Sequence, residues 1–288
     1  MFIIDYLRKS STLCYNIFMQ TLFLIMLFVI GSAIGSFLCC QARRLRLRTS
    51  RSGKGKAALG SRSVCLHCHY QLRWYDNIPL VSWLLLRGKC RKCHASIGIA
   101  EPLSELGMGL SLLAIGTTID IATAPALSWG IFVVAALFTF VLGFLAIYDG
   151  LYGELPTMCL TISIICAILL LTLREWASLS ITPFSTENIL YPLGSVLVLG
   201  GLYLLLYLVS KGKWVGDGDW LLGTAIGLAL GSPWLALIAL FITNMSACIV
   251  TIPFLKAHHT KKIYLGPFIV LAFVITFTFA DFFTSLLG

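Results

Sequence analysis

Charged residues are scarce in this sequence, and acidic residues are the scarcest of them. Only 11% of the 288 residues are charged, with 12 Asp and Glu against 21 Lys and Arg, whereas 58% are hydrophobic. So apolar a composition excludes an ordinary soluble globular protein and predicts an all-α integral membrane protein whose helices cross the bilayer repeatedly. In such a protein the positions of the basic residues, which give the net charge of +9, indicate which loops face the cytoplasm.

Two other features are missing. No glycine-rich loop of the kind that cradles nucleotides is visible in the sequence. The ten cysteines do not occur in the short secreted chain that would indicate a disulfide framework. Disulfides are also disfavoured on the cytoplasmic side of a membrane, where thiols stay reduced.

Long apolar runs divide the chain into about eight candidate transmembrane helices. A crossing takes about twenty residues. The runs cover residues 17–40, 103–119, 126–148, 155–173, 189–209, 220–230, 233–255 and 267–287. The run 220–230 is the shortest, and a re-entrant or buried helix fits its length as well as a full crossing does. The first run is interpreted as an uncleaved anchor, since it exceeds a typical signal-peptide core and a dense basic segment follows it.

The basic residues predict how these helices are oriented. If eight helices alternate, one side of the membrane holds 18 of the 21 Lys and Arg, and only Arg8, Lys9 and Arg174 lie on the other. The positive-inside rule assigns the basic side to the cytoplasm. The predicted parts are 1–40, the N-terminal tail and first helix; 41–101, a basic cytoplasmic domain; and 102–288, a seven-helix membrane domain.

Two CxxC motifs lie in the basic segment. Cys65 and Cys68 form the first motif and Cys90 and Cys93 the second, with 21 residues between them. Four thiolates in this two-plus-two arrangement are typical of a closed, tetrahedral structural zinc site, which we predict here. His67, His69 and His94 are rival ligands, but four cysteines suffice without them.

Two other interpretations of this segment are weighed. Cys90 to His94 also spells the CxxCH pattern of c-type haem attachment, which belongs on the export side and leaves Cys65 and Cys68 unexplained. A zinc motif among basic residues is also found in nucleic-acid-binding proteins. No aromatic RNA-stacking motif accompanies it, and a basic segment beside an anionic lipid leaflet is expected anyway, so no nucleic-acid partner is predicted.

Two aspartates mark the candidate catalytic site. Asp149 ends the run 126–148, and Asp219 ends the Gly216-Asp217-Gly218-Asp219 motif before the run 220–230. A carboxylate at the edge of a membrane span is costly and indicates a functional site. The alternation puts both at one membrane face, where two carboxylates that meet can share a proton and activate water as base and acid. Two independent helix-capping aspartates fit the spacing equally well.

The motifs together resemble those of the prepilin peptidases, the type IV leader peptidase family of GxGD aspartic proteases. The resemblance runs over most of the chain, from Gly35 to the last apolar runs. It rests on Gly35-Ser36-Phe37-Leu38, the two CxxC motifs, Trp74 to Pro79, Ser82-Trp83-Leu84, Arg87 to Lys89, Glu105, Asp149 with Leu155-Pro156, and Gly216 to Asp219.

The resemblance implies a specific activity and location. It implies cleavage of type IV prepilins or pseudopilins at the cytoplasmic face of the bacterial inner membrane, with Asp149 and Asp219 as the catalytic pair. Family members with the cysteine-rich domain commonly also methylate the new N-terminus with S-adenosylmethionine, whose binding residues the sequence does not identify. The sequence departs from the family pattern at Cys39, Thr157 and Leu221. These departures leave a second hypothesis, a non-catalytic membrane scaffold that binds a partner through its zinc domain.

Overall fold

The computed structural model describes residues 2–49, 64–65, 67–68, 70–179, 185–258 and 264–287. Over these ranges the chain is helical, and its β structure is limited to two isolated bridges, Val64 with Gln71 and Lys89 with Ser96. The predicted all-α fold is therefore confirmed. The basic residues at 51–62 and Lys261 and Lys262, which entered the orientation argument, lie outside the described ranges, as does His69.

Each of the eight predicted apolar runs forms a helix. They are α1 (Phe2–Thr49), α3 (Ala100–Gly116), α4 (Ala126–Tyr152), α5 (Thr157–Leu179), α6 (Glu187–Val196) continued by the π-helical η3 (Leu197–Gly201) and α7 (Leu202–Ser210), α8 (Asp219–Leu230), α9 (Pro233–His258), and α10 (Gly266–Thr278) with α11 (Ala280–Leu287). The short helices η2 (Trp74–Asn77) and α2 (Val81–Leu85) lie between α1 and α3.

Not all of these helices are long enough to cross a bilayer alone. Among the described residues five are long and apolar enough, and a sixth span results if α10 and α11, which meet at a bend of 73°, count as one. With 17 residues, α3 is at the lower limit for a crossing. With 12 residues, α8 extends only about 18 Å, less than the roughly 30 Å hydrocarbon core. The chain is a multi-pass membrane protein in which α8 is a short helix.

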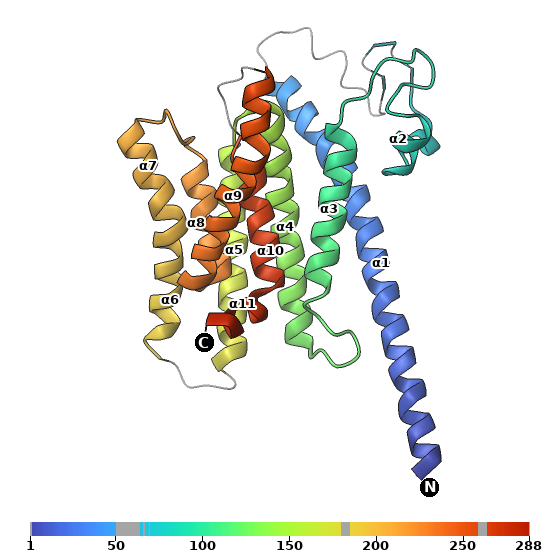
Figure 1. Cartoon of the computed structure of the whole chain (residues 1–288), viewed down its shortest axis with the longest axis vertical. Helices are drawn as coiled ribbons and strands as arrows, with labels where there is room; N and C mark the ends of the chain where they lie inside the picture. The colour runs from blue at the N-terminus through green and yellow to red at the C-terminus, as the bar shows by residue number, and fades with distance from the viewer. Residues whose placement is uncertain are drawn as a thin grey trace.

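Helix α8 lies inside the bundle, packed against α5, α6, η3 and α10 (Figure 1). Leu222 and Ile226 of α8 are buried in a core that also contains Phe138 of α4 and Phe273 of α10. At its C-terminal end, the Arg174 guanidinium donates a hydrogen bond of 2.9 Å to the carbonyl oxygen of Ala229. A cation there complements the helix dipole, as an acidic residue at the opposite end does.

Helix α1 continues nine residues beyond the apolar run that predicted it. Nothing between Cys40 and Thr49 breaks a helix, and arginine is a good helix former. Two arginines in this extension pair with acidic residues of other segments. Arg43 lies 2.6 Å from Glu101 of α3, and Arg46 lies 2.6 Å from Glu154 in the loop after α4.

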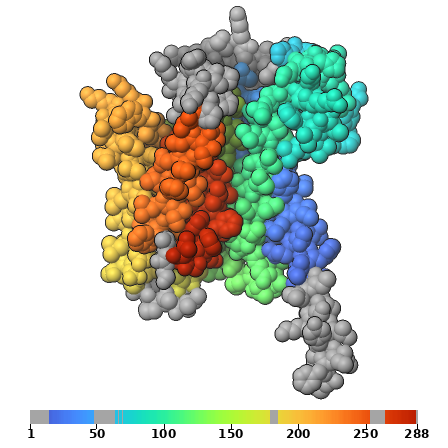
Figure 2. Space-filling model, in the orientation of Figure 1, coloured from blue at the N-terminus to red at the C-terminus, as the bar shows by residue number. Residues whose placement is uncertain are grey.

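The ends of the helices fall into two groups (Figure 1). The end of α1, the start of α3, the end of α4, and the starts of α8 and α10 lie at one end of the bundle, together with the segment from Val64 to Ile99. Figure 2 shows this segment as a lobe beside α3. The candidate site residues therefore gather at this end.

The close packing of α1 against α3 gives a first prediction. A Cβ atom at Gly35 would lie 2.8 Å from the Glu105 Cα atom of α3, whereas one at Gly107 would meet nothing within 4 Å. Gly35→Ala is therefore expected to destabilise the purified protein by about 1–3 kcal/mol through overpacking. Gly107→Ala, a change on the facing helix, is the control. Equal thermal unfolding midpoints for the two variants in detergent would contradict this packing.

Candidate active site and metal centre

Asp149 lies in the last turn of α4. Only 6% of the residue is exposed, and its Oδ2 atom accepts a hydrogen bond of 2.9 Å from the backbone N–H of Gly266. Gly266 is the first residue of α10, so the carboxylate sits at the positive end of that helix dipole. The turn itself is closed by the N–H of Gly153, which donates to the carbonyl oxygen of Asp149 and adopts a left-handed φ of 65°. Glycine adopts that conformation at no steric cost.

Asp219 is the first residue of α8 and is 8% exposed. Its Oδ2 atom accepts a hydrogen bond of 2.8 Å from the backbone N–H of Gly216, three residues earlier. A Cβ atom at Gly218 would lie 2.6 Å from the Cβ atom of Leu155, so this loop contacts the loop that follows α4. The GxGD motif is thus both a turn into a helix and a close contact with the segment after Asp149.

The two carboxylates interact electrostatically with one another. Neither takes part in an ion pair within the described part of the chain. Asp217, in contrast, is exposed. Asp149 and Asp219 are each buried, and burial in a low dielectric disfavours the charged form of a carboxyl group. Such a pair suits general acid and base chemistry.

Two neighbours of the pair were not predicted from the sequence. Gly266 lies 117 residues from Asp149 along the chain, and its Gly-Pro step at a helix start is the only local signal for it. Tyr203 of α7 is 3% exposed and lies within electrostatic reach of Asp219. It falls inside an apolar run that carries no motif, so sequence reasoning had no means of selecting it.

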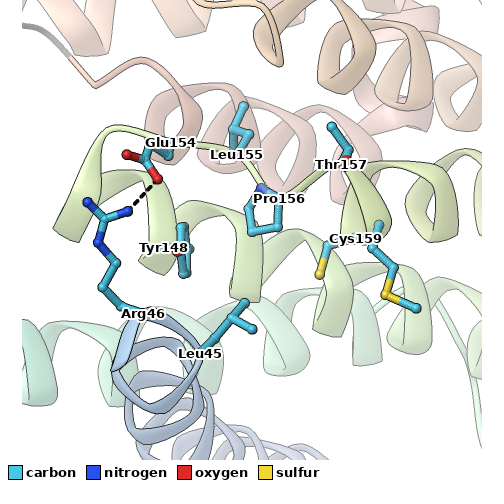
Figure 3. A pocket seen from close by; sticks show the side chains of 9 residues that line it. Leu45, Arg46, Tyr148, Glu154, Leu155, Pro156, Thr157 and Cys159 are labelled. Carbon is cyan, nitrogen blue, oxygen red and sulfur yellow. Dashed lines mark hydrogen bonds and ion pairs between the residues drawn. The ribbon is translucent and has the colours of Figure 1, made fainter. Parts of the chain in front are cut away.

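A pocket of about 660 Å³ opens beside these loops (Figure 3). Its lining comes from the end of α1, from α4 and from the start of α5, and it is mostly apolar. Tyr148 lines it next to Asp149 in the chain, and Leu155, another lining residue, contacts Gly218. Figure 3 shows the Arg46–Glu154 ion pair on one side of the pocket and Cys159 on the other. We call this space the lateral pocket.

The four predicted cysteines are brought together. The Sγ atoms of Cys65, Cys68, Cys90 and Cys93 all lie within 4.8 Å of one another. Cys65 and Cys93 are 3.8 Å apart at Sγ, and Cys68 and Cys90 are 4.0 Å apart. Regular tetrahedral zinc–thiolate geometry, with bonds of about 2.3 Å, requires Sγ separations of about 3.8 Å. The cluster can therefore hold a metal ion, and neither His67 nor His94 belongs to it.

The backbone around the cluster forms tight turns at the cysteines and lowers the pKa of one of them. Cys65 and Cys90 each begin a tight turn. The backbone N–H of Cys65 donates to the carbonyl oxygen of Tyr70, and that of Cys90 donates to the carbonyl oxygen of Ala95. Backbone N–H groups of Cys93 and Lys92 lower the pKa of Cys90 to about 6. The pKa of Cys93 is raised to about 12: the N–H of Ala95 acts to lower it, but burial and the neighbouring sulfur atoms outweigh that effect. Several thiolates this close together need a cation to neutralise them.

Comparisons with known proteins agree with this arrangement. A model of the bacterial peptidase A24 N-terminal domain matches residues 29–119. The prepilin leader peptidase/N-methyltransferase of Aeromonas hydrophila is 31% identical over 282 residues, covering 90% of this chain and 92% of that protein. The chain belongs to this family. The protein of the same name from Dickeya chrysanthemi is 32% identical over 233 residues, which cover 74% of this chain and 76% of that protein. The one from Myxococcus xanthus is 43% identical over 93 residues, which cover 32% of this chain and 26% of that protein. No solved structure matches the chain.

The membership confirms the resemblance drawn from the motifs. The matched domain, residues 29–119, contains the four cysteines and Glu105, whereas Asp149 and Asp219 lie beyond it. The prepilin leader peptidase family thus includes this chain.

The cysteine cluster gives a second prediction. The purified protein is expected to contain about one metal ion per chain, and Cys65→Ser or Cys93→Ser should remove most of it, since a tetrahedral site loses one of four ligands. Mass spectrometry for elemental content measures this. Cys248→Ser, which changes an exposed cysteine outside the cluster, should retain the metal. A metal-free wild-type protein would refute the site.

Proposed function

We propose that this protein is a membrane aspartic endopeptidase that cleaves the leader peptide of type IV prepilins or pseudopilins. Asp149 and Asp219 are the catalytic pair in this proposal. The observation that carries it is the burial of two carboxylates at one end of the bundle, neither of them in an ion pair within the described ranges. The relatives are named prepilin leader peptidase/N-methyltransferase, which supports the proposed reaction and substrate class.

The geometry supports a general acid–base mechanism. One carboxylate takes a proton from a water molecule, which attacks the scissile carbonyl carbon, and the protonated partner gives its proton to the leaving amine. Each aspartate accepts a backbone N–H from a glycine, which fixes the carboxylate without adding a charge. The lateral pocket is lined by Tyr148, which precedes Asp149, and by Leu155, which contacts the GxGD loop, and in this proposal an extended peptide approaches the pair from there.

The proposal also covers orientation and the metal. The end of the bundle that holds the pair and the cysteine lobe faces the cytoplasm of the bacterial inner membrane, as the positive-inside rule predicts. Residues 41–101 form the cytoplasmic domain and residues 102–288 the membrane domain. The ion held by the four cysteines is a structural zinc, because four thiolates leave no ligand position for a substrate.

A second activity accompanies the first. The relatives are named as N-methyltransferases as well as peptidases. We propose that this chain also methylates the N-terminal amine created by cleavage, with S-adenosylmethionine as the methyl donor. The scaffold hypothesis, in which the zinc domain only binds a partner, does not explain why two carboxylates are buried in the bundle, because a scaffold does not require them.

Substitution of the pair is the direct test. Asp149→Asn and Asp219→Asn should each lower cleavage of a prepilin by at least about 100-fold, since each removes a group that transfers a proton. Gel mobility or mass spectrometry of the prepilin in membranes containing each variant measures this. Asp217→Asn, in the same loop but exposed, should cleave as the wild type does. Processing at the wild-type rate by both site variants would leave the scaffold hypothesis standing.

The contact between Gly266 and Asp149 gives a further prediction. A Cβ atom at Gly266 would lie 2.8 Å from the Asp149 Oδ2 atom, so Gly266→Ala must displace the carboxylate or the start of α10. We expect a drop of about 10-fold or more in the rate of cleavage, because catalysis is sensitive to shifts of 1 Å. Gly150→Ala is the matched control, since its Cβ atom would make an ordinary contact of 3.6 Å with Pro267. The idea fails if the two variants cleave equally fast.

A further inference from the structure

Large apolar side chains are exposed on one short stretch of the cysteine lobe, in η2 and α2. Trp74 and Leu85 are each 78% exposed, and Ile78, Val81 and Leu84 are exposed as well. Neither the metal cluster nor the proposed peptidase mechanism uses any of these residues. A group of exposed apolar side chains in one place, rather than single ones scattered over the surface, indicates a surface that contacts something apolar.

Four of these residues share one side of α2. Val81, Leu84 and Leu85 follow the i, i+3, i+4 spacing that places side chains on one side of a helix. Ile78 lies one turn earlier, and its carbonyl oxygen accepts a hydrogen bond of 3.1 Å from the N–H four residues later, as in a helix. Trp83, in contrast, is partly buried and lines a cavity against α1 and α3. We call the side formed by Ile78, Val81, Leu84 and Leu85 the α2 face.

One hydrogen bond fixes the position of α2 along the membrane helix α3. The backbone N–H of Leu80, which precedes α2, donates to the Glu105 Oε2 atom at 2.7 Å. Glu105 lies five residues into α3, about 7.5 Å along the helix axis. The 17 residues of α3 extend about 25 Å, less than the roughly 30 Å hydrocarbon core, so its start cannot project far into water. Figure 1 shows α2 level with the first turns of α3.

The exposed apolar side of α3 reaches the same level. Leu103, Leu106 and Leu110 are exposed at helical spacing, and Ile99, just before the helix, is exposed too. Exposed apolar residues in a row on a membrane helix face acyl chains. Because Glu105 lies between Leu103 and Leu106 in the sequence, the bilayer reaches the turn of α3 to which α2 is bonded.

The residues around the α2 face suit the boundary between acyl chains and headgroups. Trp74 belongs to η2, which contacts α2, and tryptophan is enriched at this boundary. Arg87 and Lys89 follow α2 directly, are exposed, and take part in no ion pair among the described residues. Basic residues beside an apolar helix face are attracted to anionic lipids.

We propose that the α2 face inserts into the bilayer beside α3 and anchors the cysteine lobe to the membrane surface. The α2 face contacts acyl chains, Trp74 lies at their boundary with the headgroups, and Arg87 and Lys89 contact anionic phosphates. The occupant is a phospholipid bilayer with anionic headgroups, because a soluble partner would have to displace the lipid that surrounds the start of α3. The anchor does not depend on the proposed peptidase activity.

Quenching of Trp74 fluorescence tests the anchor. The full-length protein, with its metal, is placed in lipid nanodiscs of phosphatidylethanolamine and phosphatidylglycerol, which leave both membrane faces open to the solution. The difference in emission between the wild type and Trp74→Phe isolates this one of the seven tryptophans. Lipids with bromine on their acyl chains should quench this signal strongly, and acrylamide in the water should quench it weakly. Quenching by acrylamide alone would place Trp74 in water and overturn the anchor. Protection from both quenchers would mean that protein covers the α2 face, which also overturns it.

Charge on the α2 face should release it from the lipid. The double change Leu84→Glu and Leu85→Glu is expected to abolish most of the quenching of Trp74 by brominated lipid and to increase quenching by acrylamide, since carboxylates are costly among acyl chains. Gln71→Glu, which adds the same charge at an exposed polar position of the lobe, is the matched control and should change neither. The metal content of each variant reports whether the lobe is folded. A folded double variant that is quenched as the wild type is would show that the α2 face is not the anchor.

Discussion

The structure depends on holding two carboxylates in an apolar bundle, with neither of them in an ion pair among the described residues. A buried charge is tolerated only where hydrogen bonds or a shared proton compensate for lost water. Here a single backbone N–H serves each aspartate, from Gly216 and from Gly266. Both donors are glycines for the same steric reason, since a Cβ atom would lie 3.1 Å from the Oδ2 of Asp219 and 2.8 Å from that of Asp149. The close backbone approach thus favours glycine strongly at position 266 and more weakly at position 216.

Helix α8 holds one of the two carboxylates, Asp219, in place. It is too short to cross the bilayer, so it starts at the same end of the bundle as its neighbours but ends inside the bundle. The helix compensates with opposite charges at its two ends: Asp219 at the N-terminus, and Arg174 on the carbonyl oxygen of Ala229. Both complement the helix dipole. Packing of Leu222 and Ile226 in the bundle core then fixes α8, and with it Asp219, relative to α4.

The sequence predicted the parts that depend on composition and local spacing. The apolar runs corresponded to helices, and the two CxxC motifs corresponded to one cluster, because both patterns express local chemistry. It did not predict the extension of α1 to Thr49, because the apolar run ends at Cys40 and the arginines that follow were assigned to the cytoplasmic domain. Arg43 and Arg46 lie on this extension and pair with Glu101 and Glu154. Nor did it predict Gly266 or Tyr203. Contacts over 117 residues depend on how helices pack, and periodicity within one helix carries no such information.

The end of α1 forms ion pairs with two other segments. Arg43 is paired with Glu101 on the first turn of α3, and Arg46 is paired with Glu154 in the loop between Asp149 and α5. The second pair lies at the wall of the lateral pocket. Because the two arginines are three residues apart on one helix, the start of α3 and the loop after Asp149 are held about one helical turn apart along α1. The basic end of α1 thus positions the loop that follows Asp149, and with it one wall of the pocket from which the proposed mechanism brings the substrate.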